Sequence, residues 1–352
     1  MAPMGVRLSP LGVALFCLLG VGVIYHLYAG VISSRLASFS KKKKVDLRDL
    51  LAASVEAAVL GGKEVKRVRE ENGLKEKSKG ETKEGAKEFL TMGDLQSHRK
   101  MFNMLKNTFP AVTVYSEEHD AAEGETLTWS HDIPADILDK IDGGKYVDPD
   151  VLTVWIDPLD ATQEYTENLV KYVTTMVCVA VDGKPVIGVI HQPFTGFTAW
   201  AFVGQGSNMR ARSSYVLNQA KVIVSRSHSG QVKNFVQTAF GGNTTIIPAG
   251  GAGYKVLSLL DMPGTIDQAD VYIHVTFIKK WDICAGAAVL NALGGHLTTL
   301  KGENIDFRDT PLNKDGLVAT VELKHKAVLE RLPNLDHDNA SRWRNTGSKT
   351  VK

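Results

Sequence analysis

Residues 152–162 read Leu-Thr-Val-Trp-Ile-Asp-Pro-Leu-Asp-Ala-Thr, and the rest of the chain is organised around them. Its first five residues are apolar or β-branched, which predicts a buried strand that ends where Asp157 and Pro158 interrupt the ladder. The strand therefore delivers two carboxylates, those of Asp157 and Asp160, to its carboxyl end. Pro158 stiffens the turn between them, so the Leu159 carbonyl can face the same side as both acids.

Two carboxylates and a carbonyl form an all-oxygen ligand set. Such a set suits Mg²⁺, which prefers hard ligands in octahedral geometry. Thr162 adds a hydroxyl two residues after Asp160. The structural alternative for the same residues is an Asp-Pro turn followed by an aspartate that caps a helix.

Length and charge restrict the class of protein. A chain of 352 residues can bury a substantial core, so we predict one large domain or two closely packed ones. Its formal net charge of +2 gives no overall field for nucleic acid, and we expect no nucleic-acid partner. The histidines and cysteines show no zinc spacing. We predict apolar packing for Cys17, Cys178 and Cys284, and cysteine usage leaves the compartment open.

An apolar run lies near the N-terminus. Residues 11–32 contain no Asp, Glu, Lys or Arg, and a membrane span needs about 20 residues. We predict a single transmembrane helix, with residues 1–40 as the anchor and its flanks; a cleaved signal peptide, whose apolar run is about 7–15 residues, is the alternative. Lysines 41–44 favour a cytosolic C-terminal bulk, whereas sequons at Asn243 and Asn339 favour a lumenal one. The residues alone leave the orientation open.

The next segments alternate between packed and charged character. Apolar side chains recur with helical spacing over residues 45–60 and predict a packing helix. Nearly every second residue of 63–88 is charged, which predicts a solvated, mobile segment, with a lid over an active site as the alternative. Asp94 lies where a helix N-cap is expected. A predicted strand at 112–115 then delivers Glu117.

The middle of the chain is rich in strands. Apolar runs at 173–181 and 186–190 flank Asp182 and Gly183, a dipeptide typical of a tight hairpin. We therefore predict that these runs pair as neighbouring antiparallel strands.

The C-terminal half contains further polar residues at the ends of elements. Ser225 and His228 follow a predicted strand. Gly251 and Lys255 lie in a glycine-rich junction between a strand and a helix, where backbone amides can approach an anion. Asp282 lies in the first turn of a predicted helix, which a negative charge stabilises even without any catalytic role.

The acidic residues indicate a common site because of where they lie in the predicted elements. Asp94, Glu117, Asp157, Asp160 and Asp282 all fall at predicted strand ends or helix starts, which can converge on one side of a layered α/β core. Crowded carboxylates repel one another, and divalent cations relieve this repulsion. We therefore predict a Mg²⁺ site with several ions that hydrolyses a phosphate ester.

Each of these residues has a predicted task. Asp94 and Thr162 are predicted to orient and deprotonate the attacking water, a contribution of about 10²–10⁴-fold. Two ligand sets are predicted, Glu117 with Asp157 and the Leu159 carbonyl for one ion, and Asp157 with Asp160 and Asp282 for the other.

These motifs carry a family resemblance. TMGD at 91–94, the glutamates at 117–118, WIDPLDAT at 155–162 and WDICAGA at 281–287 resemble, in order, the metal motifs of the inositol monophosphatase superfamily of Mg²⁺-dependent, lithium-sensitive phosphatases. The likeness spans about residues 90 to 300. Ala161 departs from the pattern, because many members have glycine there. The resemblance implies an α/β fold of the layered αβαβα sandwich type and two or three Mg²⁺ ions.

Three further segments resemble one branch of this superfamily in particular. Residues 163–167, 225–228 and 250–255 are similar to the branch that hydrolyses 3'-phosphoadenosine 5'-phosphate to AMP and phosphate. A phosphatase of inositol phosphates and an inactive membrane-anchored binding module remain the alternatives. By this resemblance the substrate contacts are Ser225, His228, Gly251 and Lys255.

The resemblance also bears on organisation and location. It implies a single-pass Golgi membrane protein whose catalytic region faces the lumen and clears the by-product of sulfotransferases, with Asn243 and Asn339 glycosylated. A homo-oligomer is compatible with the sequence. We predict an N-terminal half at 41–215 with most metal ligands, a C-terminal half at 216–335 with the nucleotide-binding elements, and a polar tail at 336–352.

Overall fold

A computed structural model gives the fold of the chain. It describes residues 9–15, 17–23, 25, 43–81, 87–119, 126–226, 232–262, 264 and 267–333. The chain divides into two compact units, residues 1–43 and 44–352.

The N-terminal unit contains helical backbone at residues 10–15, 17–23 and 25. Residues 16, 24 and 26–32 of the predicted membrane span lie outside the described residues. Within the described part of the chain, no helix has the length and apolar character needed to cross a membrane.

A six-stranded sheet forms the first half of the large unit. Its order is β10-β9-β8-β7-β6-β4, with β6 parallel to β4 and antiparallel to β7. Asp182 and Gly183 both have positive φ and close the predicted hairpin between β7 and β8. The strand bounds are β4 (Thr113–Ser116), β6 (Leu152–Asp160), β7 (Thr174–Val181), β8 (Lys184–His191), β9 (Thr198–Phe202) and β10 (Gly206–Ser207).

A five-stranded sheet forms the second half, in the order β12-β11-β13-β17-β15. Strand β11 runs parallel to both β12 and β13. The carboxyl ends of these three strands therefore share one edge of the sheet. The bounds are β11 (Lys221–Ser225), β12 (Thr245–Ala249), β13 (Val271–His274), β15 (His296–Thr298) and β17 (Leu317–Thr320).

Helices and short ladders complete the large unit. The helices are α2 (Leu47–Glu70), α3 (Met92–Thr108), α4 (Ala135–Leu138), α5 (Thr162–Thr166), α6 (Val232–Phe240), α7 (Ala252–Leu257), α8 (Lys280–Ala292) and α9 (His325–Leu329). Three two-stranded ladders pair β1 (Val45–Asp46) with β5 (Tyr146–Val147), β2 (Lys77–Glu81) with β3 (Lys87–Leu90), and β14 (Ile278–Lys279) with β16 (Leu312–Asn313).

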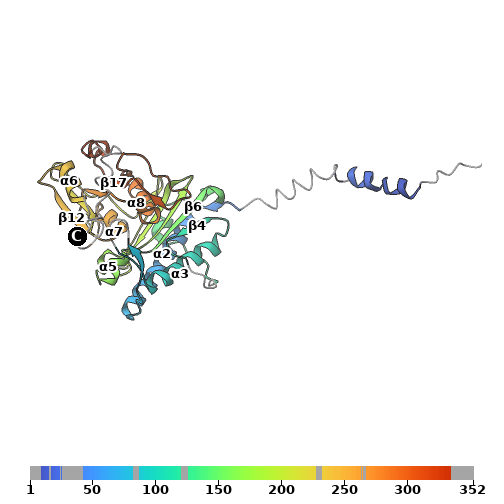
Figure 1. Cartoon of the computed structure of the whole chain (residues 1–352), viewed down its shortest axis with the longest axis horizontal. Coiled ribbons are helices and arrows are strands. Elements are labelled where there is room, and N and C mark those ends of the chain that lie inside the picture. The colour runs from blue at the N-terminus through green and yellow to red at the C-terminus, as the bar shows by residue number, and fades with distance from the viewer. Residues whose placement is uncertain are drawn as a thin grey trace, which may run out of the picture. The chain divides into compact units, whose positions relative to one another are not determined.

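The side-chain alternation of the strands produces five layers. On β7, Val177 and Val179 pack toward α2 and α3, whereas Met176 and Ala180 face the opposite cluster, which contains α7 and α8. The second sheet packs on the other side of that cluster. Helices α6 and α9 pack on the outer face of this second sheet. Figure 1 shows α2 and α3 beside the first sheet and α6 beside β12. The predicted layered α/β fold is confirmed.

Two sequence-based predictions are wrong in detail. Strand β6 does not stop at Asp157 but continues to Asp160, with a shift of register between the two residues. Pro158 has no N–H for the ladder, so it interrupts the pairing without ending the strand. Apolar packing of unpaired thiols is wrong for Cys178 and Cys284, because these buried residues form a disulfide that joins β7 to α8.

Candidate active site

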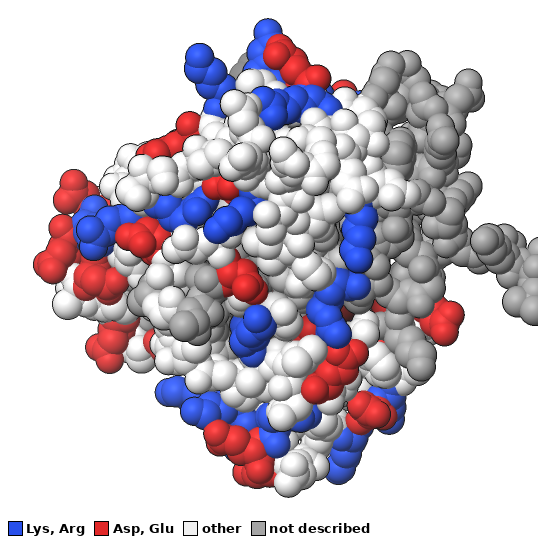
Figure 2. All heavy atoms as spheres, turned by 90° about the vertical axis from the view of Figure 1, so that its left-hand side faces the viewer, with Lys and Arg blue, Asp and Glu red and all other residues white. Residues whose placement is uncertain are grey.

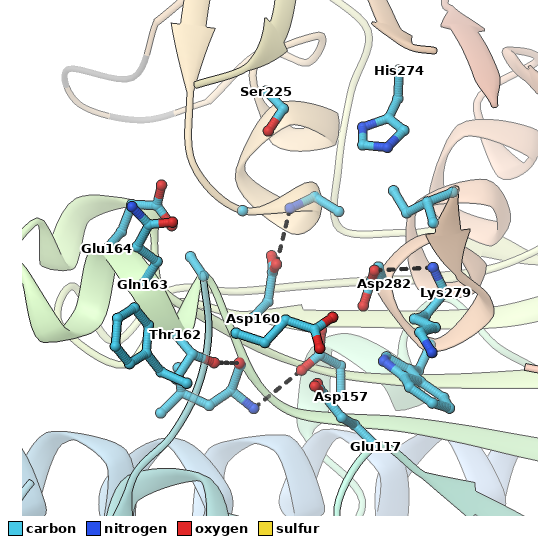
Figure 3. A pocket seen from close by; sticks show the side chains of 18 of the residues that line it. Glu117, Asp157, Asp160, Thr162, Gln163, Glu164, Ser225, His274, Lys279 and Asp282 are labelled. Carbon is cyan, nitrogen blue, oxygen red and sulfur yellow. Dashed lines mark hydrogen bonds between the residues drawn. The ribbon is translucent and has the colours of Figure 1, made fainter. Parts of the chain in front are cut away.

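The acids converge at the carboxyl end of β6. Glu117 follows β4, Asp157 lies on β6 and Asp282 lies in the first turn of α8. Each offers a carboxylate oxygen, and these oxygens all lie within 4.8 Å of one another. Figure 3 shows the three side chains pointing toward a common space. The cluster therefore unites three of the four acids that we predicted as metal ligands.

Asp157 is the most enclosed member of this cluster. Its side chain is buried, and its Oδ1 accepts a hydrogen bond of 3.1 Å from the Leu159 N–H. Its Oδ2 is buried without a hydrogen-bond partner among the described residues. Burial raises the pKa of Asp157 well above its usual range, and the charge of Asp160 raises it further. A divalent cation would supply the missing partner and reverse this shift, so the residues present fit a hard metal ion.

Asp160 is held differently from the other acids. Its carboxylate accepts hydrogen bonds from the N–H of Ala252 at 3.0 Å, the N–H of Gly253 at 2.8 Å and the Thr174 hydroxyl at 3.0 Å. We expected the amides of this glycine-rich junction to approach an anion, and in the structure that anion is Asp160. Gly251 has a φ of 63°, and a Cβ there would lie 2.5 Å from the Tyr172 carbonyl oxygen. The backbone itself therefore requires glycine at this position.

Asp94 and Thr162 form a pair at the edge of the cluster. The Thr162 hydroxyl lies 3.1 Å from Asp94 Oδ1 and 3.0 Å from the Leu159 carbonyl oxygen. The helix N-cap is Thr91 rather than Asp94, whose Oδ2 accepts from the Thr91 N–H and hydroxyl in a capping box. Burial raises the pKa of Asp94 to about 6. The capping contact and the contact with Thr162 thus use different oxygens of one carboxylate.

A hairpin reaches the site from the charged segment. Helix α2 continues to Glu70, and β2 and β3 pair at residues 77–90, so the described part of 63–88 is ordered structure rather than the mobile segment we expected. Lys79 of β2 lies 3.3 Å from Glu117 Oε1 and also forms an ion pair with Glu118. Lys79 and Phe89 line the pocket. This agrees with the alternative of a lid, and no sequence signal separates Lys79 from its charged neighbours.

The pocket extends from the acids to the second sheet. Its volume is about 420 Å³, and Ser225, Gly251 and Lys255 line it, as do Leu159 and Thr162. Figure 3 places Ser225 on the side of the pocket opposite Glu117. His228 and Asn339 lie outside the described residues.

Sequence reasoning missed several lining residues. Tyr272 and His274 come from β13, and the apolar residues Phe277, Ile278 and Leu312 also line the pocket. Burial raises the pKa of the Tyr272 hydroxyl, and the charges of Asp160 and Asp282 raise it further. The only available sequence signal for Tyr272 and His274 was their position in a mostly apolar run, residues 271–275, which favours a strand.

The outer surface has mixed charge. Figure 2 shows basic and acidic side chains interspersed over the part of that face that the structure describes. Asn243 is exposed in the turn before β12, so this sequon is sterically accessible.

The sequence is similar to a known protein family and to two named relatives. The model of the inositol monophosphatase family matches residues 46–337. A Danio rerio protein called inositol monophosphatase 3 is 68% identical over 334 residues, which cover 95% of this chain and 98% of the relative. A Homo sapiens protein called Golgi-resident adenosine 3',5'-bisphosphate 3'-phosphatase is 57% identical over 354 residues, which cover 96% of this chain and 99% of the relative.

Solved structures share the fold at low sequence identity. The extragenic suppressor protein suhB from Bartonella henselae aligns with a TM-score of 0.60 at 18% identity, over 80% of this chain and 97% of that one. An inositol monophosphatase from Anabaena aligns with a TM-score of 0.56 at 16% identity, over 82% and 97%.

Proposed function

The chain belongs to the inositol monophosphatase family, and from that premise we propose that it is a Mg²⁺-dependent phosphomonoesterase that removes the 3'-phosphate of adenosine 3',5'-bisphosphate. The products are AMP and inorganic phosphate. One observation carries the proposal: the buried, unpartnered Oδ2 of Asp157 faces a cluster with Glu117 and Asp282, next to the Asp94 and Thr162 pair.

The metal would be held by this acidic cluster. Glu117, Asp157, Asp282 and the Leu159 carbonyl offer oxygen ligands. Asp160 already accepts three hydrogen bonds, and a carboxylate has about four lone-pair sites, so it has one site left for an ion. When bound, Mg²⁺ supplies charge stabilisation for the transferring phosphoryl group and lowers the pKa of water.

Asp94 and Thr162 would handle the proton of the attacking water. The Thr162 hydroxyl has one hydrogen, which it can donate to Asp94 Oδ1, and its lone pairs then accept a hydrogen bond from water. Asp94, with a pKa raised to about 6, would take the proton as water attacks. The capping bonds from Thr91 hold the carboxylate in this orientation.

The far half of the pocket supports a nucleotide substrate. Lys255 would offer positive charge to phosphate, with Ser225 and Gly251 beside it. Phe277 and Leu312 also line the pocket, and their apolar side chains suit the flat face of a base. A small polyol needs no such surface. The second candidate is an inositol phosphate phosphatase, which the name of the Danio rerio relative favours.

A substrate panel tests the proposal. The full chain, purified in detergent, is assayed for phosphate release from adenosine 3',5'-bisphosphate and from inositol 1-phosphate, with Asp157→Asn as the background control. We expect Mg²⁺-dependent release with a higher kcat/KM for the nucleotide. A preference for inositol 1-phosphate would overturn the nucleotide assignment, and no release from either would support the inactive binding module.

The location is part of the same proposal. The relative from Homo sapiens is named as Golgi-resident. The disulfide between Cys178 and Cys284 supports an oxidising compartment, and the exposed Asn243 sequon supports exposure to the lumen. We propose that the apolar run at 11–32 anchors the chain in the Golgi membrane, where the catalytic region consumes the by-product of sulfation. A glycosidase-induced mobility shift and protease protection in intact vesicles are expected, and full digestion of the bulk would contradict this topology.

A further inference from the structure

Tyr272 projects from the second sheet into the pocket. On β13, Val271 and Ile273 belong to the cluster with α6, whereas Tyr272 belongs to the cluster with α7 and α8. The Tyr272 side chain is fully buried from bulk solvent and lines the pocket. The Tyr272 side chain therefore lies between the two sheets, and Asp160 and Asp282 line the same pocket.

The Tyr272 hydroxyl is a buried donor without a hydrogen-bond partner among the described residues. Leaving such a group unsatisfied costs about 1–3 kcal/mol, so an orphan of this kind needs an explanation. Other tyrosines satisfy theirs: Tyr165 Oη donates to the Val65 carbonyl at 2.7 Å, and Tyr215 Oη donates to the Leu259 carbonyl at 2.7 Å.

A second buried donor, the ammonium group of Lys255, lies over the Tyr272 ring. Lys255 Nζ lies 5.5 Å from the centre of the Tyr272 ring, and the Lys255 side chain is only 4% exposed. Its hydrogen bond to the Ala249 carbonyl is long, at 3.5 Å. Lys255 and Tyr272 thus bring an ammonium group and a phenolic hydroxyl to the lining of one pocket. Two donors cannot satisfy each other, but an anionic oxygen placed between them would satisfy both.

We propose that the Tyr272 hydroxyl donates a hydrogen bond to an oxygen of the scissile phosphate group, alongside Lys255. This inference rests on the proposed phosphomonoesterase activity but not on the identity of the alcohol that carries the phosphate. Asp160 and Asp282 line the same pocket as Tyr272, which is why we assign Tyr272 to the scissile phosphate rather than to a distant group. A phenol with its ordinary pKa of about 10 is protonated at neutral pH, so it can donate.

The test compares Tyr272→Phe with the wild type in the full chain with Mg²⁺. Loss of a donor worth about 1–3 kcal/mol lowers kcat/KM by about 5- to 100-fold. The ligand-free variant unfolds at the same or a higher temperature, because an unsatisfied hydroxyl has been removed. Inorganic phosphate raises the unfolding midpoint of the wild type, and we expect a smaller rise for the variant.

Tyr215→Phe is the matched control. Its hydroxyl accepts from the Arg212 N–H at 3.0 Å and donates to Leu259, outside the pocket. This variant should be less stable with unchanged kcat/KM. The inference is overturned if Tyr272→Phe stays within twofold of the wild-type kcat/KM or keeps the full phosphate-induced shift. If the wild type releases phosphate from no phosphomonoester, the proposed function fails, while the phosphate-induced shifts still decide whether Tyr272 contacts phosphate.

Discussion

The Thr162 hydroxyl lies 3.1 Å from Asp94 Oδ1, across 68 residues of sequence. Since the other oxygen of Asp94 accepts hydrogen bonds from the Thr91 N–H and hydroxyl, the start of α3 fixes the orientation of this carboxylate without any substrate. In the proposed mechanism the two residues form a preorganised route for one proton.

This pairing predicts non-additive kinetics. Thr162→Val and Asp94→Asn should each lower kcat by about 10²–10⁴-fold, because either change breaks the same proton route. The double variant should be no slower than the slower single variant. Steady-state rates with saturating Mg²⁺ measure this, and unfolding midpoints control for the altered capping box. Losses that multiply would show that the residues act separately.

The burial of Asp157 should link Mg²⁺ binding to the stability of the fold. Asp157→Asn should abolish Mg²⁺-dependent turnover while the protein stays folded. Without Mg²⁺ the variant should be at least as stable as the wild type, because one buried carboxylate has left a repulsive cluster. Adding Mg²⁺ should raise the unfolding midpoint of the wild type much more than that of the variant. Equal increases in both proteins would remove Asp157 from the ligand set.

Local patterns made part of this arrangement predictable. The apolar run before Asp157 indicated a buried strand, and Asp182 with Gly183 indicated a tight turn, because both signals depend on neighbouring residues only. The convergence of Glu117 and Asp282 on Asp157 followed from the rule that strand ends and helix starts gather at one side of a layered core.

Contacts between distant segments were not predictable in the same way. The amides of Ala252 and Gly253 bind Asp160, although their glycine-rich sequence is equally typical of a phosphate site. Lys79 reaches Glu117 only because β2 and β3 pair above the pocket. The pairing of Cys178 with Cys284, separated by 106 residues, depends on the packing of α8 on β7. Such contacts are set by tertiary geometry.

The disulfide yields a third prediction. Cys178→Ala should lower the free energy of unfolding by about 2–5 kcal/mol, because the closed loop is long. It should also weaken Mg²⁺ binding, because Cys284 lies two residues after Asp282 on α8. The variant should therefore need a higher Mg²⁺ concentration for half-maximal activity. Denaturant unfolding and Mg²⁺ titration measure the two effects.

Cys17→Ser is the control for this disulfide, because Cys17 is an exposed free cysteine. It should change neither quantity. Denatured, non-reduced wild-type protein should react with one equivalent of thiol reagent. Reaction with three equivalents would mean that Cys178 and Cys284 are unpaired in the protein as isolated.

Because the His191 side chain is buried, we expect the protein to lose stability on acidification. The side chain is 5% exposed, and its Nδ1 lies 2.8 Å from the Thr198 hydroxyl. Burial lowers the pKa of His191 to about 4, whereas an unfolded histidine titrates near pH 6.5. Between these values the unfolded chain binds the proton and the folded chain does not, so stability is present above pH 6.5 and is lost as the pH falls toward 4.

The contribution of His191 can be isolated by substitution. In this window a single buried histidine contributes a slope of at most about 1.4 kcal/mol per pH unit. His191→Asn keeps a polar atom near Thr198 but cannot take up a proton, so its urea midpoint should fall less between pH 7 and pH 5 than that of the wild type. Because His191 does not line the pocket, kcat/KM at pH 7 should be unchanged. Parallel losses in the two proteins would show that other groups account for the acid sensitivity.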